Sequence, residues 1–136
     1  MPSTTSPPNF RFRFRYVWWA IGIALLLLLV YGSLAPASAM PPIGQNDKFA
    51  HGFAYFSLMT WFAQMYAPLR SRCAIAVMLV ALGIALEFIQ PYVNRHFDWY
   101  DALANAEGVA LGLLLSLTPL RGTLACIDLR LRRRAD

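Results

Sequence analysis

Apolar residues recur in four long runs along the chain, and each run is close to the ~20 residues that a membrane-spanning helix needs. The runs occupy residues 16–34, 47–66, 73–90 and 101–118. At about 1.5 Å of rise per residue, each helix would cover roughly 27–30 Å, which matches the hydrocarbon core of a bilayer. The first run is almost wholly apolar, whereas the others carry polar residues mostly near one end. The pattern predicts an all-α membrane protein built as a bundle of four transmembrane helices.

The segments outside the runs divide the chain into three parts. Residues 1–15 predict a disordered basic tail, because they are rich in Pro, Ser, Thr and Arg. Residues 16–118 form the transmembrane domain. Residues 119–136 carry an apolar stripe at helical spacing beside several arginines, which predicts an interfacial amphipathic helix on an anionic inner leaflet. A frayed basic tail that only orients the protein is the alternative. The stripe consists of Leu120, Leu124, Ile127 and Leu131.

Charge sets the expected orientation. Only 14% of the residues are charged, against roughly 25% in a typical soluble domain. Ten of the eleven arginines lie before the first run, between the second and third, or after the fourth. Those three segments share one side of a four-span protein, and an excess of Lys and Arg marks the cytoplasmic side. We therefore expect a multi-pass protein of the bacterial inner membrane with both termini in the cytoplasm. This distribution argues against nucleic acid as a partner, despite the net charge of +5.

The N-terminus also permits a second interpretation. Arginines, an apolar run and the small residues at 37–39 together describe a secretory signal with its cleavage site. The run of 19 residues exceeds the usual apolar region of such a signal, about 7–15 residues, and aromatic residues flank it at both ends. We expect a retained span.

Ionisable and amide side chains gather at the outer ends of three predicted helices. Near hydrocarbon such groups are costly, so a cluster of them from three helices favours a pocket over structural packing. We predict that the cluster binds a polar or anionic ligand. The candidate ligand-binding residues are Asp47, Lys48, His51, Tyr55, Glu87, Gln90, Arg95, Asp98, Asp101 and Asn105.

Within this rim, Arg95 is the one arginine on the outer side, and it lies above Glu87 in the third helix. An ion pair between them is expected, because a carboxylate in a span is normally paired or protonated. Gly108 and Gly112 fall on one stripe of the fourth helix, where they let another helix approach closely. Glu107 lies off that stripe, and no role is assigned to it.

The rim motifs resemble those of the VanZ-like family of small integral membrane proteins. That family carries Asp-Lys-x-x-His followed by Tyr, then Glu-x-x-Gln ahead of an Arg, then Asp-x-x-x-Asn-x-x-Gly-x-x-x-Gly. The order and spacing agree across residues 45–118, and Asn94 departs from the pattern where many members have Gly. The resemblance implies a four-span membrane protein of the cell envelope. Its namesake is associated with low-level teicoplanin resistance, and no established reaction comes with the family.

Three functions remain open at this point. The leading one is a binding protein whose partner beyond the bilayer is an anionic lipid or a lipid-linked envelope precursor. The second is an intramembrane enzyme with His51, Glu87 and Asp101 as catalytic candidates, acting by acid–base chemistry or through a metal. The third is a small transporter. Because the chain has no Ser or Cys nucleophile motif and no paired-His spacing, we favour binding, and we expect neither a cofactor nor a metal.

Overall fold

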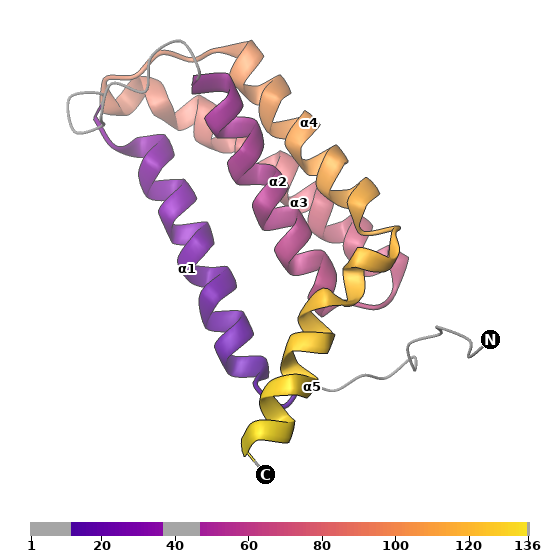
Figure 1. Cartoon of the computed structure of the whole chain (residues 1–136). Helices are drawn as coiled ribbons and strands as arrows, with labels where there is room; N and C mark the ends of the chain where they lie inside the picture. The colour runs from indigo at the N-terminus through magenta and orange to yellow at the C-terminus, as the bar shows by residue number, and fades with distance from the viewer. Residues whose placement is uncertain (1–11, 37–46, 136) are drawn as a thin grey trace.

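The computed structural model describes residues 12–36 and 47–135, and all regular secondary structure within them is helical (Figure 1). The prediction of an all-α protein is confirmed. Three predictions fall outside the described residues: the tail at residues 1–11, the cleavage site at residues 37–39 and the position of the Asp47 side chain. The helices are α1 Arg15–Leu34, α2 Asp47–Met65, α3 Leu69–Ile89, α4 Trp99–Leu115 and α5 Thr123–Ala135, with short 3-10 helices η3 Gln90–Val93 and η4 Pro119–Gly122.

Helices α3 and α4 differ most from the expected apolar runs, and α4 ends at Leu115 rather than at residue 118. Helix α3 begins at Leu69, directly after Pro68, rather than at residue 73. Arginine is a good helix former, so Arg70 and Arg72 join the first turns although they interrupt the apolar pattern. Helix α4 starts two residues before residue 101, because Asp98 and not Asp101 is its N-cap: the Asp98 carboxylate accepts from the N–H of Tyr100 at 2.8 Å.

The first four helices alternate in direction, so the molecule has two chemically different ends (Figure 1). We call the end where α1 and α3 finish and where α2 and α4 begin the polar end. The opposite end, which holds the arginines at 13–15, 70–72 and 121, is the basic end. The three predicted rim motifs all lie at the polar end.

Helices α2 and α4 make the most extensive contact in the molecule, and glycines allow it. A Cβ added to Gly108 would collide with the carbonyl of Gly52 and lie 3.0 Å from the backbone nitrogen of Phe56. At Gly112 an added Cβ would be 2.8 Å from the Cβ of Met59. The two backbones therefore approach more closely than any larger residue at these positions would permit.

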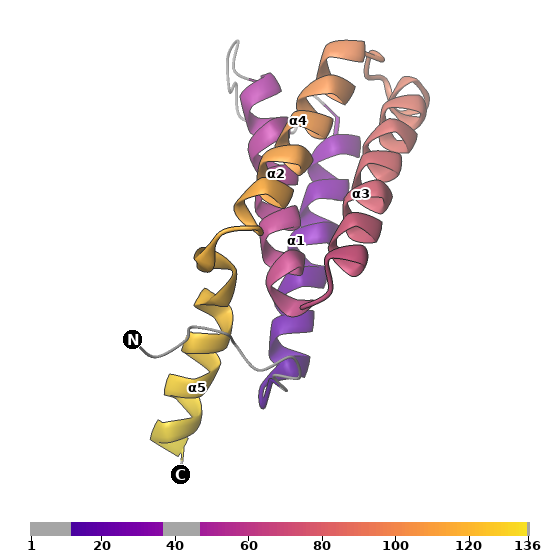
Figure 2. The same ribbon diagram turned by 90° about the vertical axis from the view of Figure 1, so that its right-hand side faces the viewer.

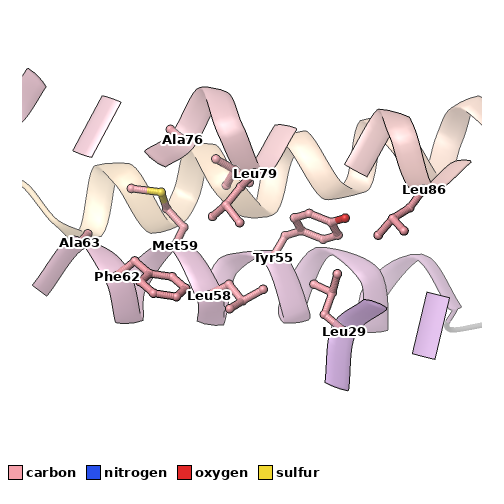
Figure 3. Packing of buried hydrophobic residues seen from close by; sticks show 10 residues of the cluster. Leu29, Tyr55, Leu58, Met59, Phe62, Ala63, Ala76, Leu79 and Leu86 are labelled. Atoms are coloured by element: carbon pink, nitrogen blue, oxygen red, sulfur yellow. The ribbon is translucent and has the colours of Figure 1, made fainter. Parts of the chain in front are cut away.

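The apolar core lies between α1, α2, α3 and α4, and it extends from Leu86 near the polar end to Ala63 and Ala76 nearer the basic end (Figure 3). Tyr55, Leu58 and Met59 of α2 are almost completely buried there. Leu79 of α3 packs into the same cluster. The buried charged and amide side chains lie toward the two ends of the described helices.

Helix α5 leaves the bundle at an angle. The axis of the segment that contains η4 and α5 is bent by 81° from that of α4, with the break at Ser116–Thr118. Figure 2 shows α5 projecting beyond the other helices at the basic end. The C-terminal segment is therefore helical and does not continue the direction of α4.

Two segments in the described part of the chain are long and apolar enough to cross a membrane: Arg15–Leu34 and Leu69–Val93. The bent pair of α4 and the C-terminal helices would add a third if it were counted as one span. Helix α2 falls outside this group. It carries Lys48, His51 and Gln64 along its length, and these lower its apolar character.

Candidate functional site

A cluster of polar side chains is buried at the polar end between α2, α3 and α4. Five of the predicted site residues belong to it, and each has at most 9% of its surface exposed. These five residues are Tyr55, Glu87, Gln90, Asp101 and Asn105. The structure thus brings together side chains from three helices that the sequence pattern had assigned to one rim. These side chains are buried between the helices, whereas residues at the rim of a membrane protein would be partly exposed to solvent.

The turn between α3 and α4 positions part of this cluster. Pro91 stands in the first turn of η3, which ends at Asn94 in the left-handed region with φ of 59°. Asparagine tolerates this conformation better than most residues. Asn94 can therefore adopt the left-handed turn that a Gly would favour at this position, where VanZ-like proteins often have Gly. The N–H of Arg95 then donates to the carbonyl of Gln90 at 3.1 Å. The chain reverses here, and Asp98 reaches the N-terminus of α4.

Glu87 is the most deeply buried carboxylate of the cluster, with 1% of its surface exposed. Its Oε2 accepts from the backbone N–H of Asp98 at 3.4 Å, which is long for a hydrogen bond. Asp98, Asp101 and His51 all lie within electrostatic range of this carboxylate. In the part of the chain that the structure describes, Glu87 therefore stands among two other acids and one imidazole, and its one described donor is a weak backbone N–H.

The two cationic residues at the polar end, Arg95 and Lys48, contact backbone carbonyls, an acid and an aromatic ring. The Arg95 guanidinium donates to the carbonyls of Gly32 at 3.0 Å and Ala35 at 3.3 Å, which lie at the end of α1. Nζ of Lys48 lies 3.6 Å from Oδ2 of Asp98 and 4.4 Å from the ring centroid of Tyr100. Arg95 therefore fastens α1 to the α3–α4 turn. Its pairing with Glu87 stays a prediction.

Gln90 makes a similar connection. Its Nε2 donates to the carbonyl of Ser33 at 3.3 Å, and both residues are buried. Two side chains from the α3–α4 turn thus satisfy backbone carbonyls in the last turn of α1, which would otherwise lack partners. The sequence analysis assigned both residues to ligand binding and missed this structural task.

Two buried polar atoms in the cluster have no hydrogen-bond partner. They are the hydroxyl of Tyr55 and Oδ1 of Asn105. A Cβ built on Gly83 would lie 3.2 Å from the hydroxyl of Tyr55 and 3.3 Å from Nδ2 of Asn105. Both side chains therefore lie next to this glycine. Figure 3 shows the Tyr55 ring between Leu79 and Leu86. Buried polar atoms are nearly always satisfied in proteins, so these two call for an explanation.

The remaining candidates lie at the margin of the cluster or away from it. His51 is partly buried, Lys48 is exposed, and Glu107 faces outward from α4. Among the residues that the structure describes, no group of three or more His, Cys, Asp or Glu side chains is arranged to hold a metal ion. His51 and Asp101 both lie within electrostatic range of Glu87.

A second set of buried polar residues lies at the basic end, and the sequence analysis did not find it. Arg72, with 3% of its surface exposed, donates to the carbonyl and hydroxyl of Ser116 at the end of α4. Oε1 of Gln64 accepts from the N–H of Leu124 at 2.9 Å, in the first turn of α5. The sequence suggested only that Arg72 helps to set the topology, yet its side chain is buried and joins α3 to the end of α4.

Asp128 of α5 is fully buried and binds the start of α1. Its carboxylate accepts from the backbone N–H groups of Arg13 at 3.0 Å and Phe14 at 3.1 Å, and from Nε1 of Trp18 at 2.8 Å. It thus acts as an N-terminal cap for α1 that comes from 110 residues or more along the chain. An acid in the middle of a basic segment was the available signal in the sequence.

Comparison with known proteins gives one informative match. No family model matches the chain, and no solved structure matches it, so the VanZ-like resemblance rests on its motifs alone. An uncharacterised protein of the fission yeast Schizosaccharomyces pombe is 35% identical over 115 residues, which cover 82% of this chain and 69% of the relative.

The source of this relative corrects one expectation. Because it comes from a eukaryote, the localisation to a bacterial inner membrane is wrong, and a bacterial cell-envelope role has no support. At this identity and coverage, the chain belongs to the same family as the fission yeast protein.

Proposed function

We propose that the protein is a VanZ-like membrane protein in which α1–α4 each cross the bilayer, with the basic end on the cytoplasmic side. Large apolar side chains exposed on the four helices support this, because a soluble monomer rarely exposes so much apolar surface. Examples are Leu27, Leu28, Phe53, Val77, Met78, Leu111 and Leu114, each at least 58% exposed.

Aromatic residues support the same placement. Tyr16 and Trp19 are exposed at the basic end, and Tyr92, Trp99 and Tyr100 are exposed at the polar end. Such aromatic side chains favour the two membrane–water interfaces. The polar cluster would then begin near the depth of the lipid head groups at Gln90 and extend inward to Tyr55 and Asn105, which lie about 9–12 Å from the starts of their helices.

The proposed function of this cluster is to bind the head group of a polar lipid through hydrogen-bond donors on that head group. The observation that carries the proposal is the pair of buried, unpartnered oxygens on Tyr55 and Asn105. Asn105 Oδ1 can only accept, and the nearby Glu87 carboxylate has one weak donor. A hydroxyl-rich or ammonium-bearing head group would supply the missing donors.

The sequence led us to expect a polar or anionic ligand, and the proposal restricts this to a polar head group that carries hydrogen-bond donors. An anionic ligand was expected to bind Arg95 and Lys48, but Arg95 contacts carbonyls of α1, and Lys48 contacts Asp98. Accepting groups predominate among the buried atoms of the site. A transport path through the bundle is not favoured, because Leu58, Met59 and Leu79 fill the space toward the basic end.

Lipid binding to the purified, detergent-solubilised protein tests the proposal. We expect native mass spectrometry to detect retained phosphatidylinositol or phosphatidylethanolamine, whose head groups carry donors, in preference to phosphatidylcholine, which carries none. Tyr55→Phe and Asn105→Leu should weaken that preference. Tyr31→Phe is the matched control, since Tyr31 is 64% exposed on α1. Equal retention of phosphatidylcholine, or an unchanged preference in both site variants, would show that the cluster is only structural.

A further inference from the structure

The geometry of α5 defines a second surface, distinct from the polar cluster. Given the proposed membrane placement, on which this inference rests, α4 stands across the bilayer. The bend of 81° then lays α5 close to the membrane plane at the basic end. A helix in this position meets the lipid head groups along its whole length.

The orientation of α5 about its own axis is fixed by the residues that it buries. Leu124 and Asp128, one turn apart, are 3% and 0% exposed. The backbone of Leu124 is bound by Gln64 of α2, and the Asp128 carboxylate is bound by the start of α1. One side of α5 is therefore attached to the bundle, and the rest of its surface is available to another partner.

Ile127, Arg130, Leu131 and Arg134 line a groove of about 270 Å³ on α5. The two apolar residues and the two arginines are each spaced four residues apart, so they form two adjacent rows on the helix. Ile127 and Leu131 are each 41% exposed. The groove thus combines apolar surface with two guanidinium groups, which bind phosphate well.

We infer that this groove is a docking surface for an anionic phospholipid of the leaflet at the basic end. Arg130 and Arg134 hold the phosphate, and Ile127 and Leu131 contact its glycerol and upper acyl region. Charge complementarity selects this occupant, since arginines are also present at 121, 132 and 133, while Asp128 is buried against α1. Juxtamembrane arginines are attracted to anionic leaflets in this way.

The test uses the full-length protein in lipid nanodiscs, with an environment-sensitive dye on Cys126. This native cysteine is exposed on α5, and Cys73→Ser removes the other site of labelling. We expect the dye emission to shift to the blue when phosphatidylserine is added to phosphatidylcholine discs. Each arginine near an anionic surface contributes about fivefold to docking, so Arg130→Gln with Arg134→Gln should reduce it roughly thirtyfold.

The matched control removes the same charge outside the groove, with Arg121→Gln and Arg133→Gln. Because Arg121 and Arg133 do not line the groove, this variant should lose clearly less of the shift than the groove variant. The inference is overturned if phosphatidylserine has no effect, or if the control loses as much as the groove variant. It is also overturned if the emission follows the number of protein copies per disc, which would make the surface an interface between copies. Extraction of the protein from liposomes by alkaline carbonate would instead refute the membrane placement itself.

Discussion

Asp128 offers the sharpest test of how the two ends of the described chain are held together. It is completely buried, and it accepts three hydrogen bonds of 2.8–3.1 Å from the start of α1. Asp128→Asn preserves the shape of the side chain but removes the charge and turns one acceptor into a donor. That donor would face the N–H of either Arg13 or Phe14, so at least one bond becomes a repulsive contact.

The expected loss follows from these contacts. A hydrogen bond to a charged group contributes about 1.5–3 kcal/mol, and a carboxylate at a helix N-terminus gains up to about 1 kcal/mol more from the helix dipole. We therefore expect Asp128→Asn to lower the free energy of unfolding by about 3 kcal/mol. Asp98→Asn makes the same chemical change at a partly exposed N-cap, where Asn caps as well as Asp, so it should cost under about 0.5 kcal/mol.

The assay is reversible denaturation of the detergent-solubilised protein, followed by tryptophan fluorescence. A double-mutant cycle with Trp18→Phe isolates the bond from the indole, and the two changes should be coupled by about 1 kcal/mol or more. If Asp128→Asn costs no more than Asp98→Asn, or if the cycle is additive, the proposed attachment of α1 to α5 is refuted.

The same contact predicts a dependence on pH. Burial alone would raise the pKa of Asp128, but the hydrogen bonds from Trp18, Arg13 and Phe14 outweigh it and lower the pKa below its ordinary value. A carboxyl group with a lowered folded-state pKa stabilises the protein above its unfolded-state pKa, which is about 4. The stabilisation should then fade as the pH falls below about 4 through the folded-state pKa. The difference between wild type and Asp128→Asn should narrow over that range.

Three further predictions concern the packing of the helices. Gly108→Ala should destabilise the protein by about 3 kcal/mol in the same denaturation assay, because the added Cβ collides with the backbone of α2. Gly122→Ala is the control, since nothing lies within 4 Å of its added Cβ, and it should change stability by under about 1 kcal/mol. Arg72→Met should cost about 2 kcal/mol by leaving the last carbonyl of α4 without its donor, and a cost near zero would contradict that role. Arg95→Gln should increase amide hydrogen exchange in the last turn of α1 and leave α2 unchanged, and equal exchange in both helices would argue against a local attachment.

Sequence patterns predicted the helices well because long apolar runs carry a strong signal. The runs at 16–34 and 47–66 lie within one residue of α1 and α2. The same patterns could not predict which polar residues bind ligand and which bind backbone. Arg95 and Gln90 have the residue types expected at a pocket, yet their described contacts are with carbonyls of α1. Composition does not reveal this difference, because it depends on where α1 ends in space.

Two charged residues, Arg72 and Asp128, are buried in the structure although the sequence analysis did not predict it. Arginines near the end of a span are normally explained by topology, so nothing in the sequence singled out Arg72 as buried within the bundle. Asp128 was similarly hidden in a segment assigned to the membrane surface. Both residues satisfy helix ends that come from distant parts of the chain. The four helix positions alone do not determine such long-range pairings.

The way α1 is fastened bears on the order in which the protein can assemble. Its end is held by Arg95, and its start is held by Asp128, so both attachments come from residues made long after the helix itself. During synthesis α1 is made before either attachment exists, and the first described helix that can bind it is α2, whose Trp61 donates to the carbonyl of Trp18 at 3.1 Å. A chain that has grown only to residue 127 lacks the carboxylate that binds the start of α1. The last described contacts of the first helix therefore form only after α5 has been made.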